Sequence, residues 1–347
     1  MKFISAEDLD RLFTFQGVTD ALRDAFVEGV TAPLRHHHTI ERASGADQTL
    51  LLMPAWSHDV AQGHIGVKIA TVSPDNGRKA LPAVMASYIL MDGDTGQPQA
   101  LIDGARLTLW RTSCASALAA RYLAPKEPET LLILGAGELA PFLARAHSAV
   151  RSYRRIVIWN RSLDKAAKLA ETLVADGFDA RATDDLDGAV AEADTISAAT
   201  LSSEPLIKGA LVKPGSHIDL VGAFTPKMRE SDDDCVRRAS IFVDTHEGAT
   251  KEGGDIAQPP LAPRAEGDRR ALFEKQAHGC QPDARTAARH HRDLTLIGRF
   301  HAPSPLPKFG KPGSGRPCIT MRCAAVGAPA VIQRSIFSGT SRGQTCA

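Results

Sequence analysis

The stretch Leu131-Leu-Ile-Leu-Gly135-Ala-Gly137-Glu-Leu-Ala140 decides the fold class of this chain. Its four apolar residues are typical of a buried strand, and its glycines allow a tight turn and a close approach of the backbone to a phosphate. Apolar side chains then recur at helical spacing as far as Val150, so the turn stands between a strand and a helix. Such a turn is typical of dinucleotide binding, although a glycine turn in another strand-helix unit is the alternative. The residues expected to contact the cofactor here are Gly135, Ala136, Gly137, Glu138 and Leu139.

The second strand of this unit ends near Trp159 and indicates which cofactor binds. A site selective for NAD has an Asp or Glu at this point, which holds the ribose hydroxyls. Here Asn160, Arg161 and Ser162 follow the strand, and a guanidinium suits a phosphate on that ribose. We therefore expect Asn160 and Arg161 to contact NADPH, with NADH as the second cofactor. The alternative is that Arg161 is a solvated residue at the start of the next helix.

Two domains precede an atypical C-terminal segment. Residues 1–118 combine one helical pattern, 6–30, with several short strand patterns, which indicates an α+β domain. A linking helix is expected over 112–122. Residues 119–257 alternate strand and helix, which is typical of a Rossmann-type, doubly wound parallel sheet, so the predicted class is α/β.

The segment 258–347 differs from the rest in charge and proline content. It holds 14 Lys and Arg against 5 Asp and Glu, and 10 of the 21 prolines, whereas residues 1–257 hold 27 against 35. We expect an irregular basic tail. A shifted reading frame is the favoured interpretation and a genuine disordered extension is the alternative. With a shifted frame, we expect the chain as written to be poorly soluble or weakly active.

Composition argues against several classes of partner. The cysteines have no zinc-ligand spacing, and consecutive residues of a strand, such as the histidines 36–38, point to opposite faces, so no metal is expected. The acidic N-terminus and the lack of a long apolar run favour a cytoplasmic protein that does not associate with a membrane. The basic tail lacks interleaved aromatic residues, so no nucleic acid is expected.

The chain resembles the ornithine cyclodeaminase and mu-crystallin family over roughly residues 1–257. The resemblance is carried by Pro33–Arg35, Leu51–Pro54, Gly66–Lys68, Leu90–Gly96, Leu109–Ala117, the glycine turn and Val221–Pro226. It implies a homodimer in which the first domain, 1–118, binds the substrate and forms the dimer, and 119–257 binds the dinucleotide.

The resemblance also implies that Arg35, Lys68 and Arg111 bind a substrate carboxylate. Two guanidiniums and an ammonium suit the one strongly anionic group of a small imino acid. The alternatives are a solvent-facing strand position for Lys68 and an ion pair at a helix end for Arg111. Further residues implied at the site are Thr200 and Val221 for the cofactor, and His38, Met53 and Phe224 for the substrate pocket.

Phe224 departs from the cyclodeaminase pattern, which the resemblance implies has an Asp at this position. A phenyl ring cannot accept a proton, and losing a positioned acid-base group costs about 10² to 10⁴ in rate. We therefore predict an NADPH-dependent reductase that converts Δ1-pyrroline-2-carboxylate to proline or Δ1-piperideine-2-carboxylate to pipecolate, with Lys68 or a bound water as proton donor. Ring size stays open, because one methylene is worth about 1 to 3 kcal/mol. The alternatives are an ornithine cyclodeaminase, an alanine dehydrogenase, or a crystallin-like protein that binds NADPH and a ligand without turnover.

Overall fold

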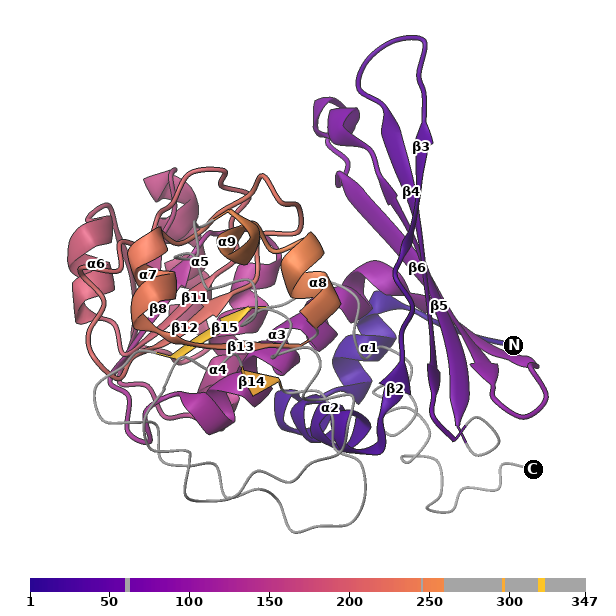
Figure 1. Cartoon of the computed structure of the whole chain (residues 1–347), viewed down its shortest axis with the longest axis horizontal. Coiled ribbons are helices and arrows are strands. Elements are labelled where there is room, and N and C mark those ends of the chain that lie inside the picture. Colours follow the sequence, from indigo (N-terminus) through magenta and orange to yellow (C-terminus); the bar gives the residue numbers. More distant parts are fainter. Residues whose placement is uncertain (60–62, 245, 259–294, 297–317, 322–347) are drawn as a thin grey trace, which may run out of the picture.

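A computed structural model describes residues 1–59, 63–244, 246–258, 295–296 and 318–321. Two β-sheets stand apart, with helices α1 to α4 between them (Figure 1). The first sheet has the strand order β1-β7-β6-β5-β4-β2, with β3 paired to β4. The second is parallel throughout, with the order β10-β9-β8-β11-β12-β15-β13-β14. The predicted α/β class with a Rossmann-type sheet is confirmed.

The sheet of the first domain is antiparallel among the described strands, except that β1 pairs with β7 in parallel. Its strands are β1 (Lys2–Ile4), β2 (Val30–Thr31), β3 (His36–Ile40), β4 (Gln48–Ser57), β5 (His64–Val72), β6 (Val84–Asp92) and β7 (Pro98–Asp103). Its helices are α1 (Ala6–Leu12), α2 (Phe15–Glu28), the 3-10 helix η1 (Pro74–Lys79) and α3 (Gly104–Leu123).

The helices of this domain differ from the sequence prediction in two ways. The single helix expected over 6–30 is two helices, because Thr14 caps the second through the N–H of Gly17, at 3.1 Å. The linking helix begins at residue 104 rather than 112, where the carboxylate of Asp103 accepts the N–H of Arg106 at 2.7 Å. Arg111 therefore lies inside α3 rather than at its start, and the expected domain boundary at residue 118 falls within the same helix.

The two faces of the first sheet are buried to different degrees. On the inner face Tyr88, Leu90, Ala100 and Ile102 are buried against α1 and α3. The outer face is also apolar, but its side chains are only half-buried or exposed. The strand registers place the following apolar residues there: Phe3, Leu50, Leu52, Trp56, Ile65, Val67, Ile69, Met85, Ile89, Met91 and Leu101.

The second sheet is built around β8 (Thr130–Leu134), all five residues of which are buried. The other elements are α4 (Leu139–Val150), β9 (Arg155–Trp159), α5 (Leu163–Ala175), β10 (Ala180–Thr183), α6 (Leu186–Glu192), β11 (Thr195–Ala198), β12 (His217–Leu220), α7 (Asp233–Arg238), β13 (Ser240–Val243), α8 (His246–Lys251) and α9 (Gly254–Ala257). Two apolar clusters form on opposite faces of β8: Leu132 and Leu134 belong to one, Leu131 and Ile133 to the other. A strand buried on both faces explains its uninterrupted apolar sequence.

The structure describes little of the segment 258–347. Beyond Gln258 it describes two short strands, β14 (Thr295–Leu296) and β15 (Cys318–Met321), and β15 pairs with both β12 and β13. These six residues are in strands, and the irregular tail stays a prediction for the segment as a whole. The predictions about the rest of the tail and its reading frame lie outside the described residues. Within the described ranges, no helix is long and apolar enough to cross a membrane.

Candidate active site

The glycine turn lies between the end of β8 and the start of α4. Gly135 has φ of +105°, and a Cβ there would lie 2.8 Å from the carbonyl oxygen of Ala199, so both conformation and space require glycine. A Cβ on Gly137, by contrast, would meet no heavy atom of the described residues within 4 Å. This open space beside the backbone at the start of a helix fits the pyrophosphate of a dinucleotide.

The loops after β11 and β12 lie beside this turn. The N–H of Val221 donates to the carbonyl of Ala198 at 2.9 Å, so Val221 stays next to the end of β11. Thr200 follows Ala199, the residue that approaches Gly135. In a doubly wound sheet, ligands bind at this carboxyl edge. The structure thus brings Thr200 and Val221 together with the glycine turn.

The end of β9 also lies at this edge. The N–H of Gly135 donates to the carbonyl of Trp159 at 2.9 Å, so the next residues begin beside the turn. The Asn160 amide donates to the carbonyl of Ser162 at 3.0 Å. Arg161 is exposed, so its guanidinium is accessible to a phosphate at the adenosine end of a cofactor.

Lys68 lies on β5, on the inner face of the first sheet. It is directly opposite Met53 on β4 and Tyr88 on β6, and paired residues of antiparallel strands share a face. Its Nζ donates to Thr108 Oγ1 at 3.4 Å, and that hydroxyl donates to the carbonyl of Gly104 at 2.6 Å. Lys68 therefore points toward α3, which rules out the alternative that it points to solvent. Sequence reasoning missed Thr108, although it precedes Arg111 by one helical turn.

The surroundings of Lys68 are strongly positive. Burial, followed by the charges of Arg111 and Arg35, lowers the pKa of Lys68 to about 7. Arg111 is itself buried on α3. Cations gathered away from water attract an anion, and a carboxylate bound here would favour the charged form of Lys68.

Arg35 joins the two domains. Its Nε donates to Glu252 Oε1 at 2.8 Å and its terminal nitrogen donates to Oε2 of the same carboxylate. The two side chains are only 6% and 16% exposed, and Glu252 lies between α8 and α9. Glu252 thus occupies the edge of the guanidinium that would otherwise grip a substrate carboxylate with two hydrogen bonds. No local pattern predicts this partner, because Glu252 is 217 positions away from Arg35.

The three predicted pocket residues, Met53, His38 and Phe224, do not all lie beside Lys68. His38 pairs with Leu50 on β4, so it lies on the outer face, opposite to Met53 and Lys68, and it is exposed. The structure therefore brings Met53, but not His38, to Lys68. Phe224 lies in the loop after β12 and is 45% exposed. Its ring is accessible to a ligand at the carboxyl edge of the second sheet.

A metal centre finds no support in the part of the chain that the structure describes. No three His, Cys, Asp or Glu side chains come together there in a way that would hold an ion. The rings of His36 and His38 lie 6.5 Å apart on an exposed strand.

A Rossmann-type sheet with a glycine turn open to a pyrophosphate, next to a domain that buries a cluster of cations, defines the class of NAD(P)-dependent oxidoreductases. The chain belongs to the ornithine cyclodeaminase/mu-crystallin family, whose model matches residues 3–281. The match continues beyond residue 257, where the resemblance was expected to end.

Named relatives and a solved structure agree with this family. The Δ1-pyrroline-2-carboxylate reductase of Colwellia psychrerythraea is 33% identical over 264 residues, which cover 75% of this chain and 82% of that protein. The ketimine reductase mu-crystallin of Mus musculus is 36% identical over 228 residues, covering 66% and 70%. The structure of the Thermococcus litoralis Δ1-pyrroline-2-carboxylate reductase, in complex with NADH and L-proline, matches with a TM-score of 0.75 at 25% identity and covers 98% of both chains.

Proposed function

We propose that this protein reduces a cyclic imino acid with NADPH: Δ1-pyrroline-2-carboxylate to L-proline, and Δ1-piperideine-2-carboxylate to L-pipecolate. The observation that carries the proposal is the buried cationic cluster at Lys68, which suits a small substrate with one carboxylate. Reductases of such imines among the relatives support it. Phe224, in place of an acid, disfavours a cyclodeaminase.

The side chains around Lys68 divide the binding of the substrate. Arg111 and Lys68 bind the carboxylate, while Arg35, held by Glu252, contributes its charge and its remaining N–H groups. With a pKa of about 7, Lys68 exchanges a proton readily at neutral pH, so it or a bound water protonates the imine nitrogen. Phe224 offers an apolar face to the ring of the substrate.

The cofactor would be held by the glycine turn, Thr200 and Val221, and would supply a hydride when bound. NADPH is favoured because Arg161 is exposed at the end of β9, where no acid stands to hold a free ribose hydroxyl. NADH is the second cofactor of the proposal, and the Thermococcus litoralis reductase was solved in complex with NADH.

The outer face of the first sheet supports the proposal that the protein is a homodimer. This apolar surface, defined above by its eleven residues, is half-buried or exposed in a single chain, and an exposed apolar patch is typical of an interface with another protein. Val67→Asp, at its centre, should lower the mass measured by sedimentation from that of a dimer to that of a monomer. Val174→Asp, at an exposed site of α5, is the control and should leave the mass unchanged. The cytoplasmic location stays a prediction from the sequence.

Two measurements test the reaction. The oxidation of NADPH is followed at a single wavelength with three substrates in turn: the five-membered imine, the six-membered imine, and pyruvate with ammonia. Ornithine is incubated separately with catalytic NAD, and the release of ammonia is measured. We expect saturable oxidation with the imines and no release of ammonia from ornithine. Turnover only with pyruvate and ammonia would indicate an alanine dehydrogenase, and ammonia from ornithine a cyclodeaminase. Cofactor binding without turnover of any substrate would indicate a crystallin-like protein.

A further inference from the structure

Glu230 is a fully buried carboxylate that connects the loops after β11 and β12. Its Oε1 accepts the backbone N–H of Thr200 at 2.6 Å and the Thr200 hydroxyl at 2.8 Å, and its Oε2 accepts the N–H of Gly222 at 2.8 Å. Both loops lie at the carboxyl edge of the sheet, beside the glycine turn. One side chain therefore sets the distance between two segments that are 22 residues apart in the sequence.

The two loops are in close backbone contact beside this carboxylate. A Cβ on Gly222 would lie 2.0 Å from the carbonyl oxygen of Thr200 and 2.6 Å from Glu230 Oε1, so the two loops touch directly. The Thr200 hydroxyl donates to Glu230, so this side chain helps to position the loop that would contact the cofactor. Phe224 follows Gly222 by two residues, so its position also depends on this contact.

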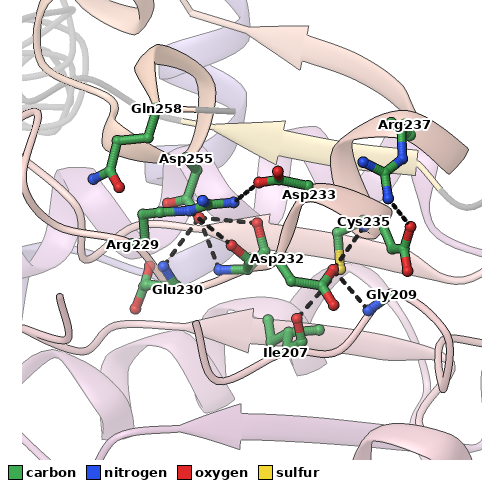
Figure 2. A network of polar contacts seen from close by, with 12 residues as sticks. Ile207, Gly209, Arg229, Glu230, Asp232, Asp233, Cys235, Arg237, Asp255 and Gln258 are labelled. Carbon is green, nitrogen blue, oxygen red and sulfur yellow. Dashed lines mark hydrogen bonds and ion pairs between the residues drawn. The ribbon is translucent and has the colours of Figure 1, made fainter. Parts of the chain in front are cut away.

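A second carboxylate, that of Asp255, binds the backbone at Glu230. Asp255 Oδ1 accepts the backbone N–H groups of Glu230 and Ser231, at 3.0 and 2.8 Å, and the Ser231 hydroxyl at 2.9 Å. Figure 2 shows Asp255 beside the backbone of Glu230, within a network that also includes Arg229. Burial raises the pKa of Glu230 to about 7, whereas the donors of Thr200 and Gly222 act in the opposite direction. A buried carboxylate held only by uncharged donors is costly to maintain, which argues for a task.

We propose that Glu230 is a positioning residue, which fixes the two loops that form the nicotinamide end of the cofactor site. It acts through Thr200 and Gly222 and does not itself touch the cofactor. The inference rests on the proposed function only as far as dinucleotide binding. We expect Glu230 to affect the binding of the nicotinamide half of the cofactor, and not that of the adenosine half near Arg161.

Glu230→Gln tests the proposal in the full-length protein. Both oxygens of the carboxylate accept hydrogen bonds, whereas a glutamine has only one acceptor oxygen. Its NH₂ group must therefore face a donor, from Thr200 or from Gly222, and that hydrogen bond is lost. Losing such a hydrogen bond should raise the Kd for NADPH about tenfold. The Kd for ADP-ribose, which lacks the nicotinamide, should change less than about twofold. Titrations by fluorescence for NADPH and by calorimetry for ADP-ribose give both values.

Asp194→Asn is the matched control, at the opposite edge of the same sheet. Asp194 accepts the N–H groups of Glu129 and Thr130 at 2.8 and 3.0 Å and pairs with Lys213 at 2.9 Å. We expect Asp194→Asn, like Glu230→Gln, to lower the melting temperature. Unlike Glu230→Gln, it should not change the Kd for NADPH more than the Kd for ADP-ribose. An equal loss of both ligands in Glu230→Gln would mean a purely structural role, and unchanged binding of both would also overturn the proposal.

A second variant covers the case in which Glu230→Gln does not fold. Thr200→Val removes one donor and keeps the carboxylate, so the same difference between the ligands should appear at a smaller size. Unchanged NADPH binding in this variant would overturn the proposal. Failure of the proposed function looks different, because the wild-type protein would then bind no dinucleotide or reduce no imine.

Discussion

Replacing Lys68 by methionine should stabilise the protein while abolishing turnover. The fall in the pKa of Lys68 from 10.5 to about 7 measures the cost of keeping its charge in the folded state. At about 1.4 kcal/mol per pKa unit this cost is about 5 kcal/mol. Lys68 keeps part of its surface exposed, so we expect about 2 kcal/mol to be recovered in the variant. Methionine retains most of the apolar stem, which limits the packing loss.

The stability gained by Lys68→Met should decrease as the pH rises. The unfolded chain keeps the Lys68 proton up to about pH 10.5, whereas the folded protein releases it near pH 7. The cost of the charge is therefore complete below pH 7 and fades as the pH rises toward 10.5. The advantage of the methionine variant should fall by about half between pH 7 and pH 9.

Urea unfolding of both proteins at pH 6.5, 7, 8 and 9 measures this difference. Lys165→Met, at an exposed site of α5, is the control, and we expect it to change the free energy of unfolding by less than about 0.5 kcal/mol at every pH. A Lys68→Met protein less stable than the wild type at pH 7, or a gain that does not vary with pH, would refute a buried and destabilised ammonium at this site.

Three other substitutions test the cofactor site and the contact between the domains. Gly137→Ala should leave the melting temperature unchanged and weaken NADPH binding about tenfold, whereas Gly135→Ala should also destabilise the fold by about 1 to 3 kcal/mol; equal effects of the two on stability would contradict the geometry of the turn. Arg161→Ala should weaken NADPH binding about tenfold or more and leave NADH binding unchanged, and equal Michaelis constants for NADPH before and after would reject Arg161 as the selector. Glu252→Gln should lower the free energy of unfolding by about 2 kcal/mol, because Arg35 would remain buried without its carboxylate, and an effect no larger than that of an exposed substitution would contradict this.

Local sequence was sufficient to predict the cofactor domain. The strand at Leu131–Leu134, the glycine turn and the helix after it occupy one short stretch, and each follows from side-chain periodicity or backbone freedom. Local sequence left two positions open for Lys68, one in the substrate site and one facing solvent. The choice between them followed only from the register with β4 and β6.

The sequence analysis misplaced or missed residues whose positions depend on pairing between distant segments of the chain. A strand shifted by one residue turns every side chain to the other face, so His38 could not be placed before its register with β4 was known. Glu252 and Glu230 were missed for a related reason. Their partners, Arg35 and Thr200, belong to other elements, and a glutamate in a loop looks like an ordinary solvated residue until the fold buries it.

The two domains hold their buried charges in different ways, and this difference bears on the substrate. In the dinucleotide domain the negative charge of Glu230 is met by N–H and hydroxyl donors that belong to the fold itself. Around Lys68 the charges that lower its pKa, those of Arg111 and Arg35, are positive, and Arg35 is itself paired with Glu252. A ligand that brings a carboxylate adds a negative charge beside Lys68, and its binding should raise the pKa of Lys68. The same event would leave Lys68 protonated beside the imine, so carboxylate recognition and proton supply follow from one electrostatic feature.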